Sequence, residues 1–450
     1  MTGLQRFRGR KVGVLGMARS GIAAARALRA AGAEVLGWDD RAESLGGIAP
    51  GRPEDIQELA ALVTSPGVPL THPVPHPVIA AARQAGVPIT CDIDLFCEIS
   101  APERIVAVTG TNGKSTTSAL IHHLLLRAGE DAELGGNIGV PVFDLRRAER
   151  YVLEVSSYQL DLCSSFHPGI AVWTNLTPDH LDRHGDLEGY IAAKRRIFSH
   201  QQAGDWAILG VDDAPSAALA DRQAAQTLRV AIGQPVEGEG FWVVDGVLHE
   251  RRAGVQTAVG RVDGFAGLRG RHNQQNAALA FAVGRVLGHA ADTLLAGLAS
   301  FQGLAHRMEE VARTGPVLWV NDSKATNPES ATKSLDAFDA VFWIAGGKPK
   351  PGGFASLRPF MRNVREAFLI GQAADEIEAD LGDLVRVRRS GTLERAMAEA
   401  GEAALASGCE PAVVLLAPAC ASFDQFKSYE HRGDVFRDLA RARLRAEAAA

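Results

Sequence analysis

A chain of 450 residues is too long for one ordinary hydrophobic core, so two or three domains are expected. Hydrophobic residues make up 46% of the chain and charged residues 22%, a composition that is typical of folded globular proteins and argues against disorder. The formal net charge of −6 excludes the strong basic excess of nucleic-acid-binding surfaces, so no nucleic-acid partner is expected.

Short apolar segments alternate with alanine-rich helical stretches along almost the whole chain. This alternation predicts an α/β protein with mainly parallel sheets, divided into three domains. Residues 1–97 are expected to form a Rossmann-like domain, and residues 98–301 a central α/β domain of the P-loop ATPase type. Residues 302–450 are expected to form a second Rossmann-like α/β domain.

The first glycine loop follows the apolar segment VGVLG and runs from Gly16 to Gly21. It resembles a dinucleotide fingerprint, but Ala18 stands where a glycine would let the backbone approach a pyrophosphate closely. Asp39 and Asp40 end the next predicted strand, where an acidic residue would meet a ribose hydroxyl. The loop predicts a nucleotide-diphosphate site, with NAD as a minority reading. A tight turn that only packs helix on strand is the alternative without a ligand.

The second glycine loop, TGTNGKST at 109–116, follows an apolar strand and opens a helix. Backbone N–H groups in such a loop surround phosphate oxygens, and the helix N-terminus favours negative charge. Lys114 would reach the terminal phosphates, and the Ser115 hydroxyl would hold Mg²⁺. Val108 stands where the strict Walker pattern has its first glycine. The strand–loop–helix context nevertheless favours phosphate binding over a turn without a ligand.

Several polar residues further along follow apolar strands or a glycine pair. Glu154 and His180 each follow a strand and carry donor atoms that suit Mg²⁺ or Mn²⁺, although alone each is read as a loop-end residue satisfied by backbone groups. Lys194, in AAKRRIF, has the pattern of a solvated helix residue. Lys348 and Lys350 follow a glycine pair, and their default reading is a surface loop.

The cysteine content and the apolar segments bear on location. The five cysteines include no CxxC pair, so neither a disulfide framework nor a structural zinc site is expected. The N-terminal apolar run is interrupted by arginines, and no apolar stretch reaches membrane-spanning length. The sequence therefore predicts a cytoplasmic protein without a membrane span.

Ordered motifs along essentially the whole chain resemble those of the Mur ligase family. Besides TGTNGKST, they are GGNIG, LEVSSYQL, TNLTPDHLDRH, AAKRRIF, GRHNQQN, AHRME, NDSKATN and APACASFDQFKSYEHRG. The last two are the most specific, and they resemble the family member that adds D-glutamate. A chance match of so many motifs in this order is not credible.

The resemblance implies an ATP-dependent ligase of peptidoglycan precursor synthesis that joins D-glutamate to UDP-N-acetylmuramoyl-L-alanine. The substrate carboxylate would attack the γ-phosphate of ATP to give an acyl phosphate, which the amine of glutamate then attacks. The implied cofactors are ATP, two Mg²⁺ ions, for which Mn²⁺ can stand in, and a lysine at position 194 carbamylated by CO₂. A monomer is expected. The resemblance implies that residues 1–97 bind the UDP substrate, residues 98–301 bind ATP and residues 302–450 bind the amino acid. The residues alone do not distinguish D- from L-glutamate.

The same resemblance assigns roles to residues matched one by one. Catalytic roles fall to Lys114, His180, Lys194 and Lys324. ATP contacts are expected at Thr111, Asn112, Gly113, Lys114, Ser115, Thr116, Thr117, Asn276, Arg307 and Asp322. Substrate contacts are expected at Arg19, Ser20, Asp40, Arg41, Ser65, Asn137, His180, Thr326, Lys350, Ser422, Phe423 and Tyr429. Metal contacts are expected at Ser115, Glu154, His180 and, as its carbamate, Lys194.

Two positions depart from the family pattern, and three rival functions stay open. Lys348 stands where an acidic residue is usual, and Asp40 where a neutral hydroxyl residue is usual. A carboxylate near a diphosphate is unfavourable unless it faces the ribose or uracil. The rivals are a sister ligase such as folylpolyglutamate synthase, a nicotinamide-dependent oxidoreductase and a non-catalytic nucleotide-binding regulator. The motif NDSKATN disfavours the sister ligase, and the GKST loop disfavours the oxidoreductase. The lysines and the metal-type residues disfavour the non-catalytic regulator.

Overall fold

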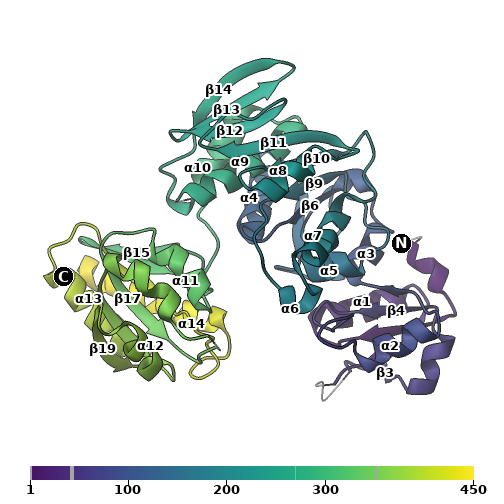
Figure 1. Cartoon of the computed structure of the whole chain (residues 1–450), viewed down its shortest axis with the longest axis horizontal. Coiled ribbons are helices and arrows are strands. Elements are labelled where there is room, and N and C mark those ends of the chain that lie inside the picture. The colour runs from purple at the N-terminus through teal and green to yellow at the C-terminus, as the bar shows by residue number, and fades with distance from the viewer. Residues whose placement is uncertain (1–2, 41–44, 269, 351, 450) are drawn as a thin grey trace. The chain divides into compact units, whose positions relative to one another are not determined.

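The computed structural model describes residues 3–40, 45–268, 270–350 and 352–449. The chain forms two compact units (Figure 1). The first comprises Met1–Asp263 with Arg271–Ser300, and the second comprises Gly264–Gly270 with Phe301–Ala450. Three separate sheets are present in the described residues, two of them in the first unit.

The first sheet has five parallel strands in the order β3-β2-β1-β4-β5. Its strands are β1 (Lys11–Leu15), β2 (Glu34–Trp38), β3 (Ala49–Pro50), β4 (Ala61–Thr64) and β5 (Ile89–Thr90), and its helices are α1 (Arg19–Ala30), α2 (Pro77–Gln84) and α3 (Asp92–Cys97). A Cβ atom at Gly21 would lie 2.0 Å from the carbonyl oxygen of Gly16. Glycine is therefore required where α1 leaves the first glycine loop.

The second sheet has nine strands in the order β14-β13-β12-β11-β10-β9-β6-β8-β7. They are β6 (Ile105–Thr109), β7 (Ala132–Gly136), β8 (Arg150–Glu154), β9 (Ile170–Trp173), β10 (Trp206–Gly210), β11 (Gln226–Ile232), β12 (Gly240–Val244), β13 (Val247–Arg252) and β14 (Val255–Arg261). The helices are α4 (Lys114–Arg127), α5 (Ser157–Leu162), α6 (Leu181–His184), α7 (Leu187–Arg195), α8 (Ala214–Ala220), α9 (Arg271–Val286) and α10 (Ala291–Ser300). Because β8 and β9 flank β6 on opposite sides, the loop after β6 lies at a switch point, where α/β sheets bind ligands.

Strands β12, β13 and β14 are antiparallel, an extension of the sheet that the expectation of mainly parallel strands did not include. Two-residue turns join them. Asp245 and Gly246 have φ of 49° and 76°, and Ala253 and Gly254 have the same pair of values. Positive φ at both central residues is the mark of the hairpin turns that match strand twist. Asp-Gly, the pair at the first turn, is among the pairs that such turns favour.

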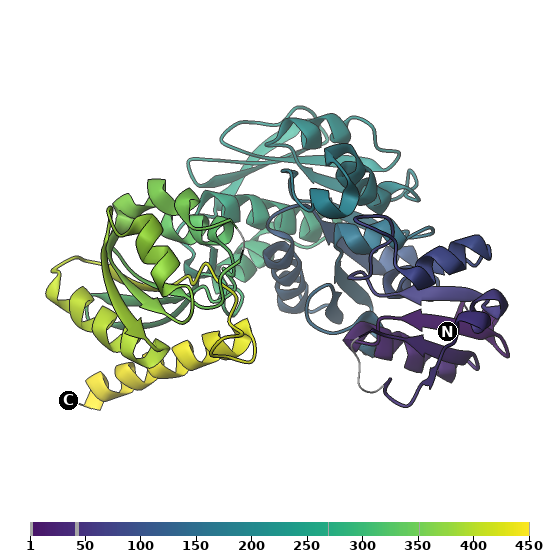
Figure 2. The ribbon, with the colours of Figure 1, turned by 60° about the horizontal axis from the view of Figure 1, so that its bottom comes forward.

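The third sheet, in the second unit, has the order β15-β16-β20-β17-β18-β19 and is parallel except for edge strand β15. Its strands are β15 (Glu309–Thr314), β16 (Val317–Asn321), β17 (Val341–Gly346), β18 (Val364–Ile370), β19 (Arg386–Gly391) and β20 (Ala412–Leu416). Its helices are α11 (Pro328–Leu335), α12 (Ala374–Leu381), α13 (Leu393–Ala406) and α14 (Tyr429–Ala449). Separate apolar cores line its two faces, and Figure 2 shows the long C-terminal helix α14 in yellow.

The α/β architecture with largely parallel sheets is confirmed. The proposed boundaries at residues 97 and 301 stay predictions, although each falls between the last strand of one sheet and the first strand of the next. Among the described residues, no helix combines the length and the apolar character that a membrane crossing requires.

Close packing at the end of β10 gives a testable consequence. A Cβ atom at Gly210 would lie 2.1 Å from the carbonyl oxygen of Thr174, which belongs to the backbone and cannot rotate away. Gly210→Ala should therefore destabilise the first unit by about 2 kcal/mol, as overpacking does. Gly204→Ala is the matched control, because no atom lies within 4 Å of its Cβ position. Urea unfolding followed by hydrogen exchange of β9 and β10 measures both variants, and equal stabilities would contradict the packing argument.

Candidate active site

The loop between β6 and α4 is built from backbone conformations that glycine favours. Gly110 has φ of 142° and Gly113 has φ of 83°. A Cβ atom at Gly110 would lie 1.9 Å from the Thr174 hydroxyl oxygen, and one at Gly113 would lie 2.4 Å from Asn276 Oδ1. The loop therefore fits closely between the end of β9 and helix α9, with the N-terminus of α4 at its end.

Side chains from β9 and α9 hold this loop. The backbone N–H of Asn112 donates to Asn175 Oδ1 at 2.9 Å, and the Thr174 hydroxyl donates to the Asn112 carbonyl at 2.6 Å. Asn276, which is 2% exposed, accepts a hydrogen bond from the Thr117 hydroxyl at 3.1 Å. The structure thus brings Asn276 against the predicted phosphate loop, although 159 residues separate it from Thr117.

Two lysines meet at one carbonyl oxygen of the loop. Lys194 Nζ donates to the Gly110 carbonyl at 2.6 Å, and Lys114 Nζ donates to the same oxygen at 3.0 Å. Lys194 is 1% exposed and lies 4.9 Å from the centroid of the Tyr190 ring. Burial first, and then the charge of Lys114, hold the pKa of Lys194 well below its usual range. The default reading of Lys194 as a solvated helix residue is therefore wrong.

The carboxylate of Glu154 lies at the end of β8, 1% exposed. Its Oε1 accepts a hydrogen bond from Asn137 Nδ2 at 2.7 Å, and the Asn137 N–H donates to the Glu154 carbonyl at 2.8 Å. Its Oε2 is buried without a hydrogen-bond partner among the described residues. A buried carboxylate oxygen is costly unless it meets a cation or a donor, so this oxygen fits a divalent cation.

His180 precedes helix α6 in a left-handed conformation with φ of 52°, which is uncommon for a residue with a side chain. Its two ring nitrogens are engaged on opposite sides. Nδ1 lies 3.1 Å from the Tyr158 hydroxyl, and Nε2 lies 3.4 Å from Asp179 Oδ2. Within the described part of the chain, no group of three or more His, Cys, Asp or Glu residues is arranged to hold a metal ion by itself.

A cleft of about 620 Å³ opens beside the loop. Asn175 lines it and also binds the loop backbone. The other lining residues include Asp212, Asp213, Arg271, His272 and Gln275. None of these was a predicted site residue, although GRHNQQN contains three of them. The volume of the cleft and the polar residues that line it are typical of a small-molecule binding site.

The first sheet places several predicted substrate residues near the first glycine loop. Ser65 Oγ donates to the Gly16 carbonyl at 2.7 Å, and Ser20 lines a narrow recess with Ser65 and Asp92. Arg19 is exposed at the start of α1. Arg41 lies outside the described residues.

Asp40 is not isolated at the end of β2. Its Oδ2 lies 3.0 Å from His76 Nε2. His76 Nδ1 accepts from the Val78 N–H, so Nε2 carries the proton and donates to the carboxylate. Asp39, its neighbour, accepts from the Met17 N–H at 2.6 Å. Asp40, which departs from the family pattern, is therefore paired with His76. Sequence reasoning missed this partner.

In the second unit, two predicted residues lie together. Lys324 Nζ is 3.9 Å from the centroid of the Tyr429 ring, a cation–π contact. Asp322 is buried and accepts hydrogen bonds from the Ser334 hydroxyl and the Met308 N–H. Burial raises the pKa of Asp322 to about 6, against the hydrogen bond from Ser334.

The remaining predicted residues of this unit are spread over its loops. Thr326 N–H donates to the Lys324 carbonyl at 2.8 Å, and Arg307 lies where its charge lowers the pKa of Asp322. Ser422 is buried and its carbonyl accepts from Phe426 N–H, whereas Phe423 is 70% exposed. Lys350 is exposed.

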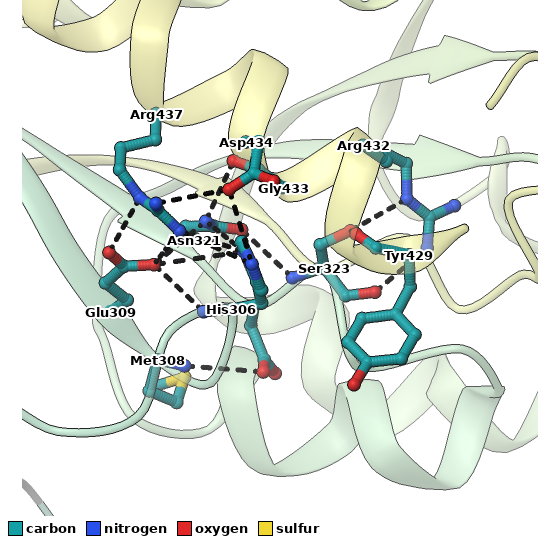
Figure 3. A network of polar contacts seen from close by, with 11 residues as sticks. His306, Met308, Glu309, Asn321, Ser323, Tyr429, Arg432, Gly433, Asp434 and Arg437 are labelled. Carbon is teal, nitrogen blue, oxygen red and sulfur yellow. Dashed lines mark hydrogen bonds and ion pairs between the residues drawn. The ribbon is translucent and has the colours of Figure 1, made fainter. Parts of the chain in front are cut away.

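A polar network that sequence reasoning missed supports these loops (Figure 3). Arg432 is fully buried and donates to the Ser323 hydroxyl at 2.9 Å and to the carbonyls of Ser323 and Cys420 at 2.9 and 3.2 Å. Asn321 Nδ2 lies 3.1 Å from both His306 Nδ1 and Glu309 Oε2. The contacts of Arg432 with Ser323 tie α14 to the segment that follows β16, 109 residues away in the sequence.

Comparisons with known proteins identify the class. The Mur ligase middle domain family matches residues 108–284, and the family described as Mur ligase, glutamate ligase domain, matches residues 306–420. These ranges contain the phosphate loop, Lys114, Lys194 and Lys324, whereas Tyr429 follows the second range. Together with the full-length relatives described next, these matches show that the chain belongs to the Mur ligase family.

Those relatives are named UDP-N-acetylmuramoylalanine–D-glutamate ligase. The protein of Nitrobacter winogradskyi is 48% identical over 97% of both chains, and that of Caulobacter sp. strain K31 is 47% identical over 96% of both. Among solved structures, MurF ligase from Thermotoga maritima in complex with ADP has a TM-score of 0.59 at 18% identity, covering 98% of this chain and 100% of that one. A diaminopimelate–D-alanyl-D-alanyl ligase from Acinetobacter baumannii has a TM-score of 0.59 at 16% identity over 98% of both chains. The structural likeness confirms the three-domain α/β fold.

The buried Asp92 yields a pH-dependent prediction. Burial raises the pKa of Asp92 from 3.8 to about 6, so the folded state binds its proton more tightly than the unfolded state. The stability that this proton provides is present below about pH 4 and is lost as the pH rises through about 6. Asp92→Asn should therefore gain stability over the unchanged protein as the pH rises, by at most about 3 kcal/mol at neutral pH.

Hydrogen exchange of the amides of α3 in urea, at about pH 4 and about pH 7.5, measures this difference. The Ile93 N–H, which donates to Asp92 Oδ1 at 2.9 Å, keeps an acceptor in the asparagine variant. A stability difference that is the same at both pH values would show that Asp92 ionises as in the unfolded chain.

Proposed function

We propose that this protein is an ATP-dependent ligase that joins D-glutamate to UDP-N-acetylmuramoyl-L-alanine. The observation that carries the proposal is the pair of lysines on the Gly110 carbonyl, in a chain that resembles D-glutamate ligases over its full length. The Lys114 cation beside a glycine loop and a helix N-terminus makes a site for a polyanion. The triphosphate of ATP is such a ligand, and the MurF ligase of similar fold is a complex with ADP.

The proposed reaction has two steps that balance. A carboxylate oxygen of the muramoyl-alanine attacks the γ-phosphorus, the bond to the β-phosphate oxygen breaks, and ADP leaves with an acyl phosphate remaining. The amine of glutamate then attacks the acyl carbon, and inorganic phosphate leaves with the former carboxylate oxygen and, in the net balance, with the proton that the amine loses. The first step brings two anions together, so Lys114 would lower its barrier by neutralising charge.

We propose that ATP contacts Thr111, Asn112, Gly113, Lys114, Ser115, Thr116, Thr117 and Asn276 in the first unit and Arg307 and Asp322 in the second. The cleft of about 620 Å³ beside the loop is our candidate for the nucleoside. Its polar lining would fix the orientation of a base or ribose.

For the divalent cations, we propose Ser115, Glu154 and His180 as ligands, with Mg²⁺ or Mn²⁺ as the ion. Bound there, a cation supplies Lewis-acid polarisation of phosphate oxygens. The buried Glu154 Oε2 supports this assignment. Mg²⁺ prefers oxygen ligands, so His180 would suit Mn²⁺ as well.

We further propose that Lys194 is carbamylated. Within the described residues Lys194 forms no ion pair, and a buried ammonium without one is costly. Burial and the charge of Lys114 lower the pKa of Lys194, which favours the neutral amine, the form that adds to CO₂. The resulting carbamate is an anion, so it would be attracted to the charge of Lys114.

For the other substrates, we propose that the UDP end contacts Arg19, Ser20, Asp40, Arg41 and Ser65, and that its acyl end contacts Asn137 and His180. Glutamate would contact the second unit at Thr326, Lys350, Ser422, Phe423 and Tyr429, with Lys324 near the acyl phosphate. A cytoplasmic monomer is the proposed form, and sedimentation at two protein concentrations tests the monomer.

Omitting one substrate at a time tests the proposed function. Phosphate release from ATP should require UDP-N-acetylmuramoyl-L-alanine and D-glutamate together, and L-glutamate should not replace D-glutamate. Release with a folate acceptor would indicate the sister ligase, and nicotinamide turnover would indicate the oxidoreductase. ATP binding without release under any combination would indicate a regulator.

Lys114→Ala should lower kcat/KM by about a hundredfold or more, because it removes a cation from the site of phosphate charge. Arg127→Ala is the control, since Arg127 is an exposed cation at the other end of the same helix α4. The phosphate-release assay compares the two variants. Near-normal activity in a folded Lys114→Ala protein would exclude the assignment of Lys114 to the phosphates.

Lys194→Ala should fold normally, lose most activity and regain part of it in excess acetate, because acetate supplies the missing carboxylate-like charge. Acetate should not rescue Lys114→Ala, where the lost group is a cation, and Lys194→Arg should stay inactive because its charge has the wrong sign. With ¹³C-labelled bicarbonate, NMR should show a carbamate signal that Lys194→Ala lacks. Full activity of Lys194→Ala, or no carbamate signal, would contradict carbamylation.

A further inference from the structure

A buried arginine joins the segment of Ser65 to the segment of His180. Arg183, in α6, is 7% exposed, and its Nη2 donates to the Val68 carbonyl at 2.6 Å, across 115 residues of sequence. The Val68 N–H donates to the Ser65 carbonyl at 3.1 Å, and the Ser65 hydroxyl in turn donates to the Gly16 carbonyl at 2.7 Å. The guanidinium thus holds the turn that closes on the first glycine loop.

The same arginine is linked to His180 in two ways. Its backbone N–H donates to the His180 carbonyl at 3.0 Å. Its guanidinium carbon lies 5.3 Å from the centroid of the Tyr158 ring, and the Tyr158 hydroxyl lies 3.1 Å from His180 Nδ1. Because packed side chains have little room to shift, a displacement of the Arg183 guanidinium would move the Tyr158 ring and, with it, the His180 ring.

Burying an arginine at position 183 is energetically unfavourable if the side chain serves only to fill space. Among the described residues it forms no ion pair, and its Nη1 is buried without a hydrogen-bond partner. Burial lowers its pKa. Removing a guanidinium from water without a carboxylate opposes folding, and an apolar side chain would fill this volume at lower cost. The long side chain and planar guanidinium of arginine allow it to contact the Val68 carbonyl and the Tyr158 ring at the same time.

We propose that Arg183 is a positioning residue that fixes, through Val68 and Tyr158, the separation between the Ser65 turn and His180. These two ends are where the proposed function places the UDP group and the reacting acyl end of one substrate. The inference rests on that proposed function. Arg183 would set how far the substrate carboxylate reaches toward the phosphate loop, while itself touching no reacting atom. Tyr158 would orient the His180 ring.

The first test changes Arg183 and measures binding as well as turnover. Arg183→Met should keep the melting temperature of the unchanged protein but raise both KM and the calorimetric Kd for UDP-N-acetylmuramoyl-L-alanine by about tenfold or more, as misplacement of a substrate does. The Kd for ADP should stay within about twofold, because the phosphate loop has its own supports. Arg183→Lys should recover only part of the affinity, since lysine cannot contact both partners.

The matched control is Arg195→Met, which removes an exposed arginine from α7, the next helix. It should leave every substrate affinity unchanged. Tyr158→Phe keeps the ring and removes the hydroxyl. It should lower kcat and the affinity for Mn²⁺ in the presence of ADP, measured by electron paramagnetic resonance, by about fivefold, the effect of one hydrogen bond.

Three outcomes would overturn the proposal. One is an unchanged Kd for the UDP substrate in a folded Arg183→Met protein. Another is a parallel loss of affinity for all substrates together with a lower melting temperature, which indicates a structural role only. The third outcome is needed only if Arg183→Met does not fold. It is the combination of an unchanged Mn²⁺ affinity in Tyr158→Phe and an unchanged affinity for the UDP substrate in Arg183→Lys. Failure of the proposed function would look different, because the unchanged protein would then bind no UDP substrate and release no phosphate.

Discussion

The convergence of Lys114 and Lys194 on the carbonyl of Gly110 is the interaction on which the candidate site depends. The Lys194 amine is buried beside the charge of Lys114, and both effects lower its pKa. The strands and helices around the loop hold this arrangement in place, since Gly110 and Gly113 have conformations and neighbours that exclude larger residues. The proposed carbamate at Lys194 and the phosphates of ATP would each place negative charge beside Lys114.

The same physical feature recurs in other parts of the molecule. Arg183 in the first unit and Arg432 in the second are both buried, and neither forms an ion pair among the described residues. Each donates to backbone carbonyls of segments that carry expected substrate contacts. A ligase that brings together ATP, a nucleotide-linked carboxylate and glutamate handles only anionic substrates. Fixed positive charge that the protein does not neutralise itself fits that task.

Local sequence predicted what depends on local structure. The strand, loop and helix around Lys114 were predicted because their signals lie within one short segment. The position of Lys194 was not, since AAKRRIF has the pattern of a solvated helix and burial comes from packing against β6 and its loop. Only the family resemblance singled out Lys194. His76, Arg183 and Arg432 were missed because their partners lie far away in the chain, at Asp40, Val68 and Ser323.

Oxygen tracing can follow the proposed activation of the substrate carboxylate as an acyl phosphate. UDP-N-acetylmuramoyl-L-alanine labelled with ¹⁸O in its alanyl carboxylate is incubated with the protein, ATP and D-glutamate, and the inorganic phosphate is analysed by ³¹P NMR. If an acyl phosphate forms, each phosphate released carries one ¹⁸O atom from the carboxylate. Phosphate that forms together with the amide product but contains no ¹⁸O would contradict the proposed activation.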